Sequence, residues 1–536
     1  MRKLIALLCA VMPVAIPASA QDASALLQRI EQITTRPVFK HSMVGVEVYD
    51  LTSHKVLVAM NQDKLFTSGS TTKVVTEGTA LALLGENYRF HTRVYHTGSI
   101  TPDGTLQGDL VLVASGDPNL SGRVKLDDTL DYVARDHSYA GVSVAVPVRG
   151  DPLRVFKELA SAVLMKGIWR IRGNVIIDAS LFPSNQVEPA THTTISPVML
   201  NDNVLDVTVA AASSPGGPVS ISVSPELPYL KVINQVKTGK AESDAELRFT
   251  SDVAEADGSH TVVLEGNVPA GEKALAVYKV KDPVLFAAEG FRAALRWAKI
   301  VLEAPTEGST LNLSQTDARR KLLTEHVSPP FKEEVKLTLK VSQNLHAAMT
   351  PYLLGAILAH SSKDAFRKGL EVERKFLADA GLDPESVSQL DGEGGVGSAF
   401  SPDFMVRFLA YMSSQPYGRL FFDSLPVLGR DGTLSELMKD SPAAGHVRAK
   451  TGSYVVSNGL NNGVMLLGKG LVGYVDAANG HRLIFAAFAN LVPLRNMDDV
   501  ADVGEMLSVM AAAAYQYAPP LLASSHKAPS RKPSQK

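Results

Sequence analysis

Two stretches near the start of the chain have hydrophobic patterns of different period. Between Met43 and Met60 apolar and polar residues alternate, for example in Val44-Gly-Val-Glu-Val48. A two-residue period of this kind predicts an antiparallel hairpin. Between Thr71 and Leu84 the apolar residues instead follow helical spacing, which predicts an amphipathic helix directly after the hairpin. A strand pair followed by a helix indicates the start of an α/β sandwich.

The pattern changes again in the middle of the chain. From about Tyr88 to Val280 it consists mostly of short apolar runs separated by Gly, Pro, Asp and Asn, which predicts β-rich inserted domains. Later segments return to helical periodicity or to alternation. Helices are predicted within residues 284–302, 333–360, 366–380 and 500–517, and strands within residues 460–491.

The two ends of the chain differ from the rest. Residues 1–20 combine the basic pair Arg2-Lys3, an apolar run and the triplet Ala18-Ser-Ala20, which together predict a cleavable secretory signal peptide. The apolar run is too short to cross a bilayer, and no later stretch reaches about 20 apolar residues. Residues 519–536 are polar and basic and are predicted to be a disordered tail. We therefore expect an exported, periplasmic protein without a transmembrane segment.

The amino-acid composition argues against some classes of function. The chain has 536 residues, of which 45% are hydrophobic and 20% charged, enough for about two to four domains. A net charge of −2 provides no basic surface for nucleic acid, so no nucleic-acid partner is expected. The only cysteine, Cys9, lies in the predicted signal peptide. No His-Glu-x-x-His motif or cysteine cluster suggests a metal site, and no other cofactor is expected.

The first candidate catalytic residues lie at the start of the predicted helix. In Ser70-Thr-Thr-Lys73 the hydroxyl and the amine fall three positions apart, which places them on one helix face within hydrogen-bond reach. The start of a helix also directs backbone N–H groups and a positive dipole end at an oxyanion formed beside Ser70. A second Ser-x-x-Lys, at Ser524 to Lys527, lies in the polar tail. Alone, Ser70 would more often be an ordinary N-cap serine.

A second motif, Ser342-Gln-Asn344, is the only Ser-x-Asn in the chain and lies in a predicted helical stretch. The hydroxyl of Ser342 can relay a proton, and the side-chain amide of Asn344 can hold a substrate carbonyl while it accepts from a lysine. Polar residues of this kind are common at helix starts. The motif therefore gains weight only in combination with others.

A Lys-Thr-Gly triplet occurs twice. Lys450-Thr-Gly-Ser453 leads into apolar alternation and is predicted to lie on an edge strand. There Gly452 lets a ligand approach the backbone, while Lys450 and the hydroxyls of Thr451 and Ser453 can bind a terminal carboxylate. Lys237-Thr-Gly239 is followed by a polar run, so we interpret Lys237 as a surface-loop residue.

The ordered set Ser-x-x-Lys, Ser-x-Asn and Lys-Thr-Gly is the signature of serine penicillin-recognising enzymes. Each motif alone could have a purely structural role. Because all three occur in this order in a chain predicted to be exported, we favour the catalytic interpretation. Ser70 and Ser342 are separated by 272 positions, far more than a compact β-lactamase would place there. An insertion of domain size is therefore expected between the first two motifs.

Six separated segments carry a wider likeness: Ser115–Leu120, Gly173–Asp178, Leu200–Val204, Ser342–Leu345, Leu425–Leu434 and Lys450–Gly452. In this order they resemble the D-alanyl-D-alanine carboxypeptidase/endopeptidase family of penicillin-binding protein 4, the low-molecular-mass class C type. The resemblance implies an α/β fold with a β-lactamase/transpeptidase-like domain and two nested β-rich inserted domains. The expected division is 1–20 signal peptide, 21–87 and 326–518 catalytic domain, 88–200 and 270–325 first inserted domain, 201–269 second nested domain and 519–536 tail.

The family likeness implies a serine-type D-Ala-D-Ala carboxypeptidase or DD-endopeptidase that acts on peptidoglycan stem peptides and is inhibited by β-lactam antibiotics. Ser70 would be acylated, with Lys73 as the general base and Ser342 passing the proton to the leaving amine. The backbone N–H groups of Ser70 and Ser453 would form the oxyanion hole. The substrate-binding residues would be Asn344, Lys450, Thr451, Gly452 and Ser453.

The chain departs from the family pattern in two places. It has Asp391-Gly-Glu-Gly-Gly-Val396 where the family usually has Asp-Gly-Ser-Gly-Leu-Ser, and Ser453 where the family usually has Thr. Ser453 keeps the hydroxyl. Glu393 could act as a deacylating base, but we favour a solvated loop glutamate.

Two other functions are less consistent with the sequence. A β-lactamase shares the three motifs but fits the long first spacing poorly, and a catalytically idle wall-binding homologue is disfavoured by the intact motifs. Because all three motifs lie outside residues 88–325, we expect the inserted region to select the substrate and to be dispensable for acylation. The sequence leaves open the balance of carboxypeptidase and endopeptidase activity and whether the protein forms a homodimer.

Overall fold

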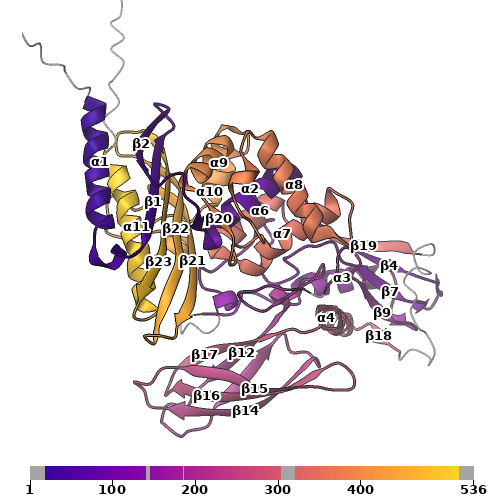
Figure 1. Ribbon diagram of the computed structural model, residues 1–536. Coiled ribbons are helices and arrows are strands. Elements are labelled where there is room, and N and C mark those ends of the chain that lie inside the picture. The colour runs from indigo at the N-terminus through magenta and orange to yellow at the C-terminus, as the bar shows by residue number, and fades with distance from the viewer. Residues whose placement is uncertain (1–17, 140–144, 185, 304–319, 518–536) are drawn as a thin grey trace, which may run out of the picture.

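The computed structural model describes residues 18–139, 145–184, 186–303 and 320–517 (Figure 1). Its centre is a five-stranded antiparallel sheet in the order β2-β1-β23-β22-β21. The sheet joins strands from both ends of the sequence, and β21 forms one of its edges, as predicted from the alternation after Lys450. The bounds are β1 Met43–Asp50, β2 Lys55–Met60, β21 Val447–Asn458, β22 Gly463–Asp476 and β23 Arg482–Leu494.

Helices cover both faces of this sheet (Figure 1). On one face lie α1 Ala18–Thr34 and α11 Asp498–Tyr517, whose apolar side chains share a buried cluster with the sheet. The other face carries a helical block with its own buried cluster. This block consists of α2 Thr72–Leu84, α6 Phe331–Leu337, α7 Asn344–Ile357, α8 Ala365–Asp379, α9 Pro402–Ser414 and α10 Gly418–Ser424. The sequence pattern indicated α2, α7, α8 and α11 but not the separate helices α9 and α10.

The chain leaves and re-enters this α/β layer along paired strands. The outgoing strand β4 and the returning strand β19 are antiparallel neighbours in a sheet of order β19-β4-β7-β9. A second sheet has the order β18-β8-β6-β5, and α3 Arg154–Met165 and α4 Pro283–Trp297 pack with both in one buried cluster. The strands are β4 His91–His96, β5 Ser99–Ile100, β6 Thr105–Gln107, β7 Leu110–Val113, β8 Arg170–Ile171, β9 Val175–Asp178, β18 Val301–Leu302 and β19 Lys321–Val327.

Two further sheets form a separate layer, drawn at the bottom of Figure 1. Their orders are β13-β12-β17 and β14-β16-β15. The expected boundary at residues 269 and 270 is wrong in detail, because β17 pairs with β12 along its whole length and so belongs to this layer. The bounds are β12 Val204–Ala210, β13 Ser220–Ser224, β14 Leu230–Gly239, β15 Glu246–Ala254, β16 His260–Pro269 and β17 Lys273–Lys279.

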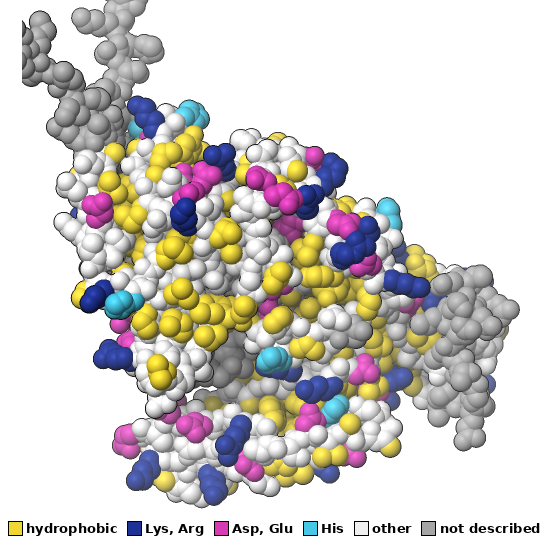
Figure 2. Space-filling model, in the orientation of Figure 1, with side chains coloured by type: hydrophobic (Ala, Val, Ile, Leu, Met, Phe, Trp, Pro, Cys, Tyr) yellow, Lys and Arg dark blue, Asp and Glu magenta, His cyan; other side chains and the backbone are white. Residues whose placement is uncertain are grey.

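Short pairs complete the described structure: β3 Phe66–Thr67 with β20 Ala399–Phe400, and β10 Gln186–Val187 with β11 Thr194–Ile195. The space-filling view shows side chains of both charges interspersed with apolar ones over the visible face (Figure 2). Within the described residues, no helix is both long and apolar enough to span a membrane. Most of the predicted signal peptide and the whole predicted tail lie outside the described residues.

Candidate active site

Ser70 lies in a 3-10 turn, Gly69–Thr71, that leads into α2. Lys73, one turn further on, is fully buried and donates a hydrogen bond to Ser70 Oγ at 2.8 Å. The same amine donates to Asn344 Oδ1 at 2.7 Å and to the backbone carbonyl of Glu393 at 3.2 Å. Burial lowers the pKa of Lys73, against the opposing effect of nearby carboxylates. The neutral amine that a general base needs is therefore easier to reach than for a lysine in water.

The second motif occupies a break between two helices. A π-helical turn, Thr338–Ser342, ends with Ser342 in the left-handed region at φ 65°, and α7 begins at Asn344. Lys450, which is fully buried, donates to Ser342 Oγ at 2.8 Å. Its pKa is lowered well below the ordinary value by burial and by the charge of Lys73. Each of the two predicted serines therefore faces its own buried lysine.

Glycines bring the turn of Ser70 against the edge of the sheet. A Cβ on Gly452 would lie 2.2 Å from the backbone oxygen of Ser68. A Cβ on Gly69, whose φ is 48°, would lie 2.7 Å from the backbone nitrogen of Ser453. Only residues without a Cβ fit these two contacts, so the backbone of β21 lies directly beside the turn that carries Ser70.

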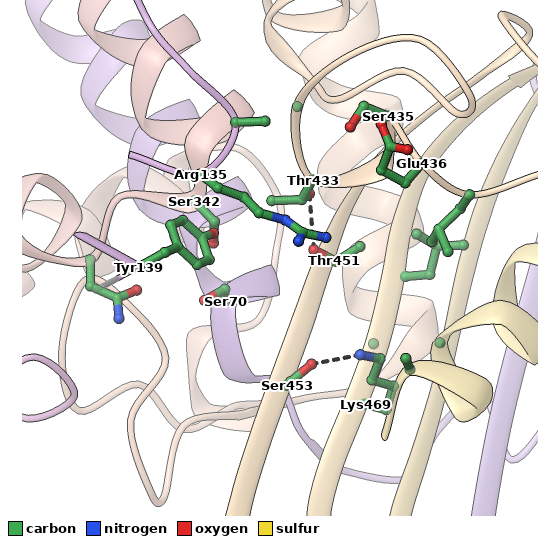
Figure 3. Close-up of a pocket in the computed structure, with 18 of the residues that line it drawn as sticks. Ser70, Arg135, Tyr139, Ser342, Thr433, Ser435, Glu436, Thr451, Ser453 and Lys469 are labelled. Atoms are coloured by element: carbon green, nitrogen blue, oxygen red, sulfur yellow. Dashed lines mark hydrogen bonds between the residues drawn. The ribbon is translucent and has the colours of Figure 1, made fainter. Parts of the chain in front are cut away.

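The three motifs open onto a cleft of about 430 Å³. In Figure 3, Ser70, Ser342, Thr451 and Ser453 are seen around this space, and the side chain of Lys469 points toward Ser453. The structure thus brings all eight predicted site residues together. Lys73 and Lys450 lie behind the cleft, Gly452 packs under the turn of Ser70, and the remaining predicted residues line the cleft: Ser70, Ser342, Asn344, Thr451 and Ser453.

The inserted region forms one wall of the cleft. Arg135, Ser138, Tyr139 and Thr191 all line it. The hydroxyl of Tyr139 donates to the backbone carbonyl of Val341 at 2.5 Å, next to the second motif. The insertion therefore contacts the chain that carries Ser342, although all three motifs lie outside the insertion in the sequence.

Glu393 is buried, with 4% of its surface exposed, so our interpretation as a solvated loop residue is wrong. Its carboxyl group hydrogen-bonds that of Glu188, which is fully buried and comes from the connection between β10 and β11. Burial and the contact with Glu188 raise the pKa of Glu393 to about 10. Burial would also raise the pKa of Glu188, but hydrogen bonds from Glu393 and Thr191 hold it below its ordinary value. The pair therefore keeps one proton at neutral pH, on Glu393, and a protonated Glu393 cannot serve as a general base.

A buried ionic network lies behind the second motif. Asp202 accepts from Arg123 at 2.7 Å and lies 2.9 Å from Nε2 of His137. His346, on α7, contacts both Asp202 and Glu334. The carboxylates raise the pKa of His346 to about 10 despite its burial, so its imidazolium persists at neutral pH. Asp202 belongs to the Leu200–Val204 segment of the family likeness, and its partner Gln343 belongs to the Ser342–Leu345 segment. Glu188 and Tyr139 lie in no segment of this kind, and no sequence signal indicated them.

The second copies of the motifs lie elsewhere. Lys237 is exposed and sits near the end of β14, in the separate lower layer. It is thus on a strand rather than on the predicted loop, and the part of the chain that lines the cleft does not include it. Ser524 falls outside the described residues. The described residues contain no group of three or more His, Cys, Asp or Glu side chains arranged to hold a metal ion.

Two curated relatives resemble this chain over most of its length. The "D-alanyl-D-alanine carboxypeptidase DacB" of Haemophilus influenzae is 24% identical over 469 residues, which cover 85% of this chain and 87% of that protein. The "Penicillin-sensitive carboxypeptidase A" of Dictyostelium discoideum is 24% identical over 474 residues, covering 85% of this chain and 83% of that protein.

The fold has a solved counterpart. Penicillin binding protein 4 from Haemophilus influenzae superposes with a TM-score of 0.67 at 20% identity, covering 91% of this chain and 99% of that one. A TM-score of this size shows that the two proteins share their overall fold. The model of the D-Ala-D-Ala carboxypeptidase 3 (S13) family matches residues 26–511. Because this match spans nearly the whole described chain, the protein belongs to the D-Ala-D-Ala carboxypeptidase 3 (S13) family.

Proposed function

We propose that this serine-type D-Ala-D-Ala carboxypeptidase uses Ser70 as its nucleophile and hydrolyses D-Ala-D-Ala ends and D-Ala cross-links of peptidoglycan stem peptides. The observation that carries the proposal is the contact of the Lys73 amine with both Ser70 Oγ, at 2.8 Å, and Asn344 Oδ1, at 2.7 Å. A nucleophile that touches a buried base, which in turn is held by a third group, is the arrangement that acyl transfer requires. β-Lactams, which acylate such serines, are the expected inhibitors.

The acylation step moves one proton through the lysine and serine pair. Neutral Lys73 accepts the hydroxyl proton of Ser70 while Ser70 Oγ bonds to the substrate carbonyl carbon. The tetrahedral intermediate then breaks its C–N bond, and the proton returns to the leaving nitrogen through Ser342, whose hydroxyl is held by Lys450 at 2.8 Å. Water subsequently attacks the ester and releases the acyl group and a regenerated Ser70.

Substrate binding falls to β21 and to the start of α7. Thr451 and Ser453 would bind the terminal carboxylate, with Lys450 supplying positive charge behind them. Asn344 would hold the substrate amide. The backbone N–H groups of Ser70 and Ser453 would form the oxyanion hole, where one donor contributes about 3 to 4 kcal/mol in comparable sites. The close approach of Gly69 to the Ser453 nitrogen supports this pairing.

The domain division is also proposed. Sheet membership supports an α/β catalytic domain made of two separate stretches, an inserted domain that begins and ends at β4 and β19, and a nested domain formed by residues 204–279. We further propose that signal peptidase cleaves after Ala20 and that the mature protein works in the periplasm. Mass spectrometry of the exported protein would refute this if Met1 were retained.

Labelling with a fluorescent penicillin tests the nucleophile. The wild-type protein should form a stoichiometric adduct and release D-Ala from a D-Ala-D-Ala peptide, whereas Ser70→Ala should do neither, because loss of a nucleophile costs orders of magnitude in rate. Lys237→Ala serves as the matched control and should label like wild type. A folded Ser70→Ala protein that carries a stoichiometric adduct would show that another serine is acylated.

The same experiment separates the alternative functions. A β-lactamase would lose its adduct rapidly and turn over penicillin continuously. An idle homologue would form no adduct and release no D-Ala.

A further inference from the structure

A third lysine, Lys469, faces the cleft and belongs to none of the three motifs. It lies on β22, directly opposite Ser453 of β21 in the antiparallel register. Its Nζ donates a hydrogen bond to Ser453 Oγ at 2.8 Å, drawn as a dashed line in Figure 3. No motif surrounds this lysine on its alternating strand, so the sequence pattern gave no indication of it.

Within the part of the chain that the structure describes, no carboxylate neutralises this lysine. Among the described residues, no Asp or Glu is found in an ion pair with Lys469, and Ser453 Oγ is the acceptor found for its amine. Burial alone lowers the pKa of Lys469, to about 8, so the side chain remains mostly charged at pH 7. Its charge in turn helps to lower the pKa of Lys450. The charged Lys469 therefore lies beside the buried amine of Lys450, and Glu436, the carboxylate that lines the cleft, is paired with Lys439. An anionic ligand in the cleft would compensate the charge of Lys469.

The neighbouring helix leaves room for the side chain. Gly504 of α11 lines the cleft, and a Cβ at this position would lie 2.8 Å from Cε and 3.1 Å from Nζ of Lys469. The absence of a side chain at Gly504 is therefore what lets the ammonium lie between α11 and the edge strand.

We propose that Lys469 binds, together with Thr451 and Ser453, the α-carboxylate of the substrate residue that follows the scissile bond. Because Ser453 accepts a hydrogen bond from Lys469, its own hydroxyl proton is available to a carboxylate in the cleft. The lysine adds a second donor and a full charge to the same carboxylate. The enzyme should consequently discriminate against peptides in which this carboxylate is amidated. The inference rests on the proposed function and extends it to substrate choice.

A pair of peptides tests this proposal: one ends in D-Ala-D-Ala with a free carboxylate, and the other is identical but ends in the carboxamide. The measured quantity is the ratio of kcat/KM for the acid to kcat/KM for the amide. Replacement of a charged hydrogen-bond donor should lower this ratio about 10- to 100-fold in Lys469→Gln. Lys469→Arg, which keeps the charge, should retain most of the preference. Lys237→Gln, at an exposed lysine outside the cleft, is the matched control and should keep the wild-type ratio.

Two further measurements complete the test. In wild type the acid-to-amide ratio should fall as the pH rises through about 8, because the ammonium deprotonates, whereas Lys469→Arg should show no such fall. Gly504→Ala, which crowds the ammonium but keeps it, should lower the ratio less than Lys469→Gln does. An acid-to-amide ratio in Lys469→Gln equal to that of wild type would overturn the proposal, whether or not both rates had dropped. Penicillin labelling separates this outcome from a failure of the proposed function. At saturation, Lys469→Gln should carry a stoichiometric adduct, whereas Ser70→Ala should carry none.

Discussion

Asp202 accepts a hydrogen bond from the side-chain amide of Gln343 at 2.9 Å, and this contact ties the inserted region to the middle residue of the Ser-x-Asn motif. Both residues are buried. Asp202 has φ 54° and lies between Asn201 and Asn203, which are also left-handed. Three consecutive left-handed residues without glycine are strained unless their surroundings hold them. The hydrogen bonds and ion pairs of this segment therefore have a positional role.

Asp202→Asn should impair both stability and acylation. Removal of this charge leaves Arg123 and the imidazolium groups of His137 and His346 with less compensation in a buried site, because nearby carboxylates raise the pKa of each histidine to about 10 despite burial. Such a loss typically costs about 3 to 5 kcal/mol of stability. The loosened segment should also let Gln343 shift, so we expect the rate of penicillin labelling to fall at least about tenfold. Thermal unfolding and labelling kinetics measure the two effects.

Asp178→Asn is the matched control for this variant. Asp178 is also a buried carboxylate of the inserted region, paired with Arg320 at 2.8 Å, but it contacts none of the three motifs. It should lose stability while keeping the labelling rate. A folded Asp202→Asn protein that labels as fast as Asp178→Asn would show that the contact with Gln343 does not position the motif.

Glu393→Gln should change the pH dependence of stability. Below its ordinary pKa of 4.5, Glu393 is protonated in the folded and unfolded chain alike; between pH 4.5 and about 10 it stays protonated only in the folded protein. The contribution of Glu393 to the free energy of unfolding therefore falls as the pH rises through that window. The neutral amide of Gln has no such dependence, so the melting temperature of Glu393→Gln relative to wild type should rise between pH 5 and 9.

The same variant tests whether Glu393 acts as a base in deacylation. Because its carboxyl group is already protonated at neutral pH, Glu393→Gln should keep D-Ala release within about tenfold of wild type. General-base catalysis contributes roughly 100- to 10,000-fold. If Glu393→Gln lost D-Ala release by that factor while acylation stayed intact, Glu393 would be a base in deacylation, despite its buried pair with Glu188.

Local sequence patterns predicted the parts of the site that depend on period and order. Alternation located the hairpin of Met43 to Met60 and the edge strand after Lys450, and helical spacing located the helix behind Ser70. The order of the motifs then selected Lys450 over Lys237, and the structure places Lys450 in contact with Ser342.

The missed features depend on long-range packing. Glu188 and Glu393 are 205 positions apart, and nothing around either residue signals that the two carboxyl groups meet or that they are buried. Tyr139 likewise reaches Val341 across 202 positions. Lys469 could have been found only from the register of β21 and β22, and a bulge between Tyr454 and Val455 shifts that register.

Gly452→Ala should separate the edge strand from the turn of Ser70. The new Cβ would lie 2.2 Å from the backbone oxygen of Ser68, and a backbone atom cannot move aside as a flexible side chain can. A displacement of about 1 Å at a reacting group can cost about 100-fold in rate, so penicillin labelling should slow by roughly this factor. Gly459→Ala, beyond the end of the same strand where a Cβ meets nothing within 4 Å, should label normally. Normal labelling by Gly452→Ala would mean that the close contact is not needed for acylation.

Tyr139→Phe tests whether the inserted region supports the chemistry as well as the choice of substrate. The variant removes only the hydroxyl that donates to the carbonyl of Val341, one residue before Ser342. A single neutral hydrogen bond contributes about 0.5 to 1.5 kcal/mol, so penicillin labelling should slow about 2- to 10-fold. Tyr95→Phe, on β4 in the same region and away from the cleft, removes an equivalent hydroxyl and should leave the rate unchanged. If both variants label at the wild-type rate, the inserted wall does not contribute to acylation through this contact, and its part in the site is limited to the shape of the cleft.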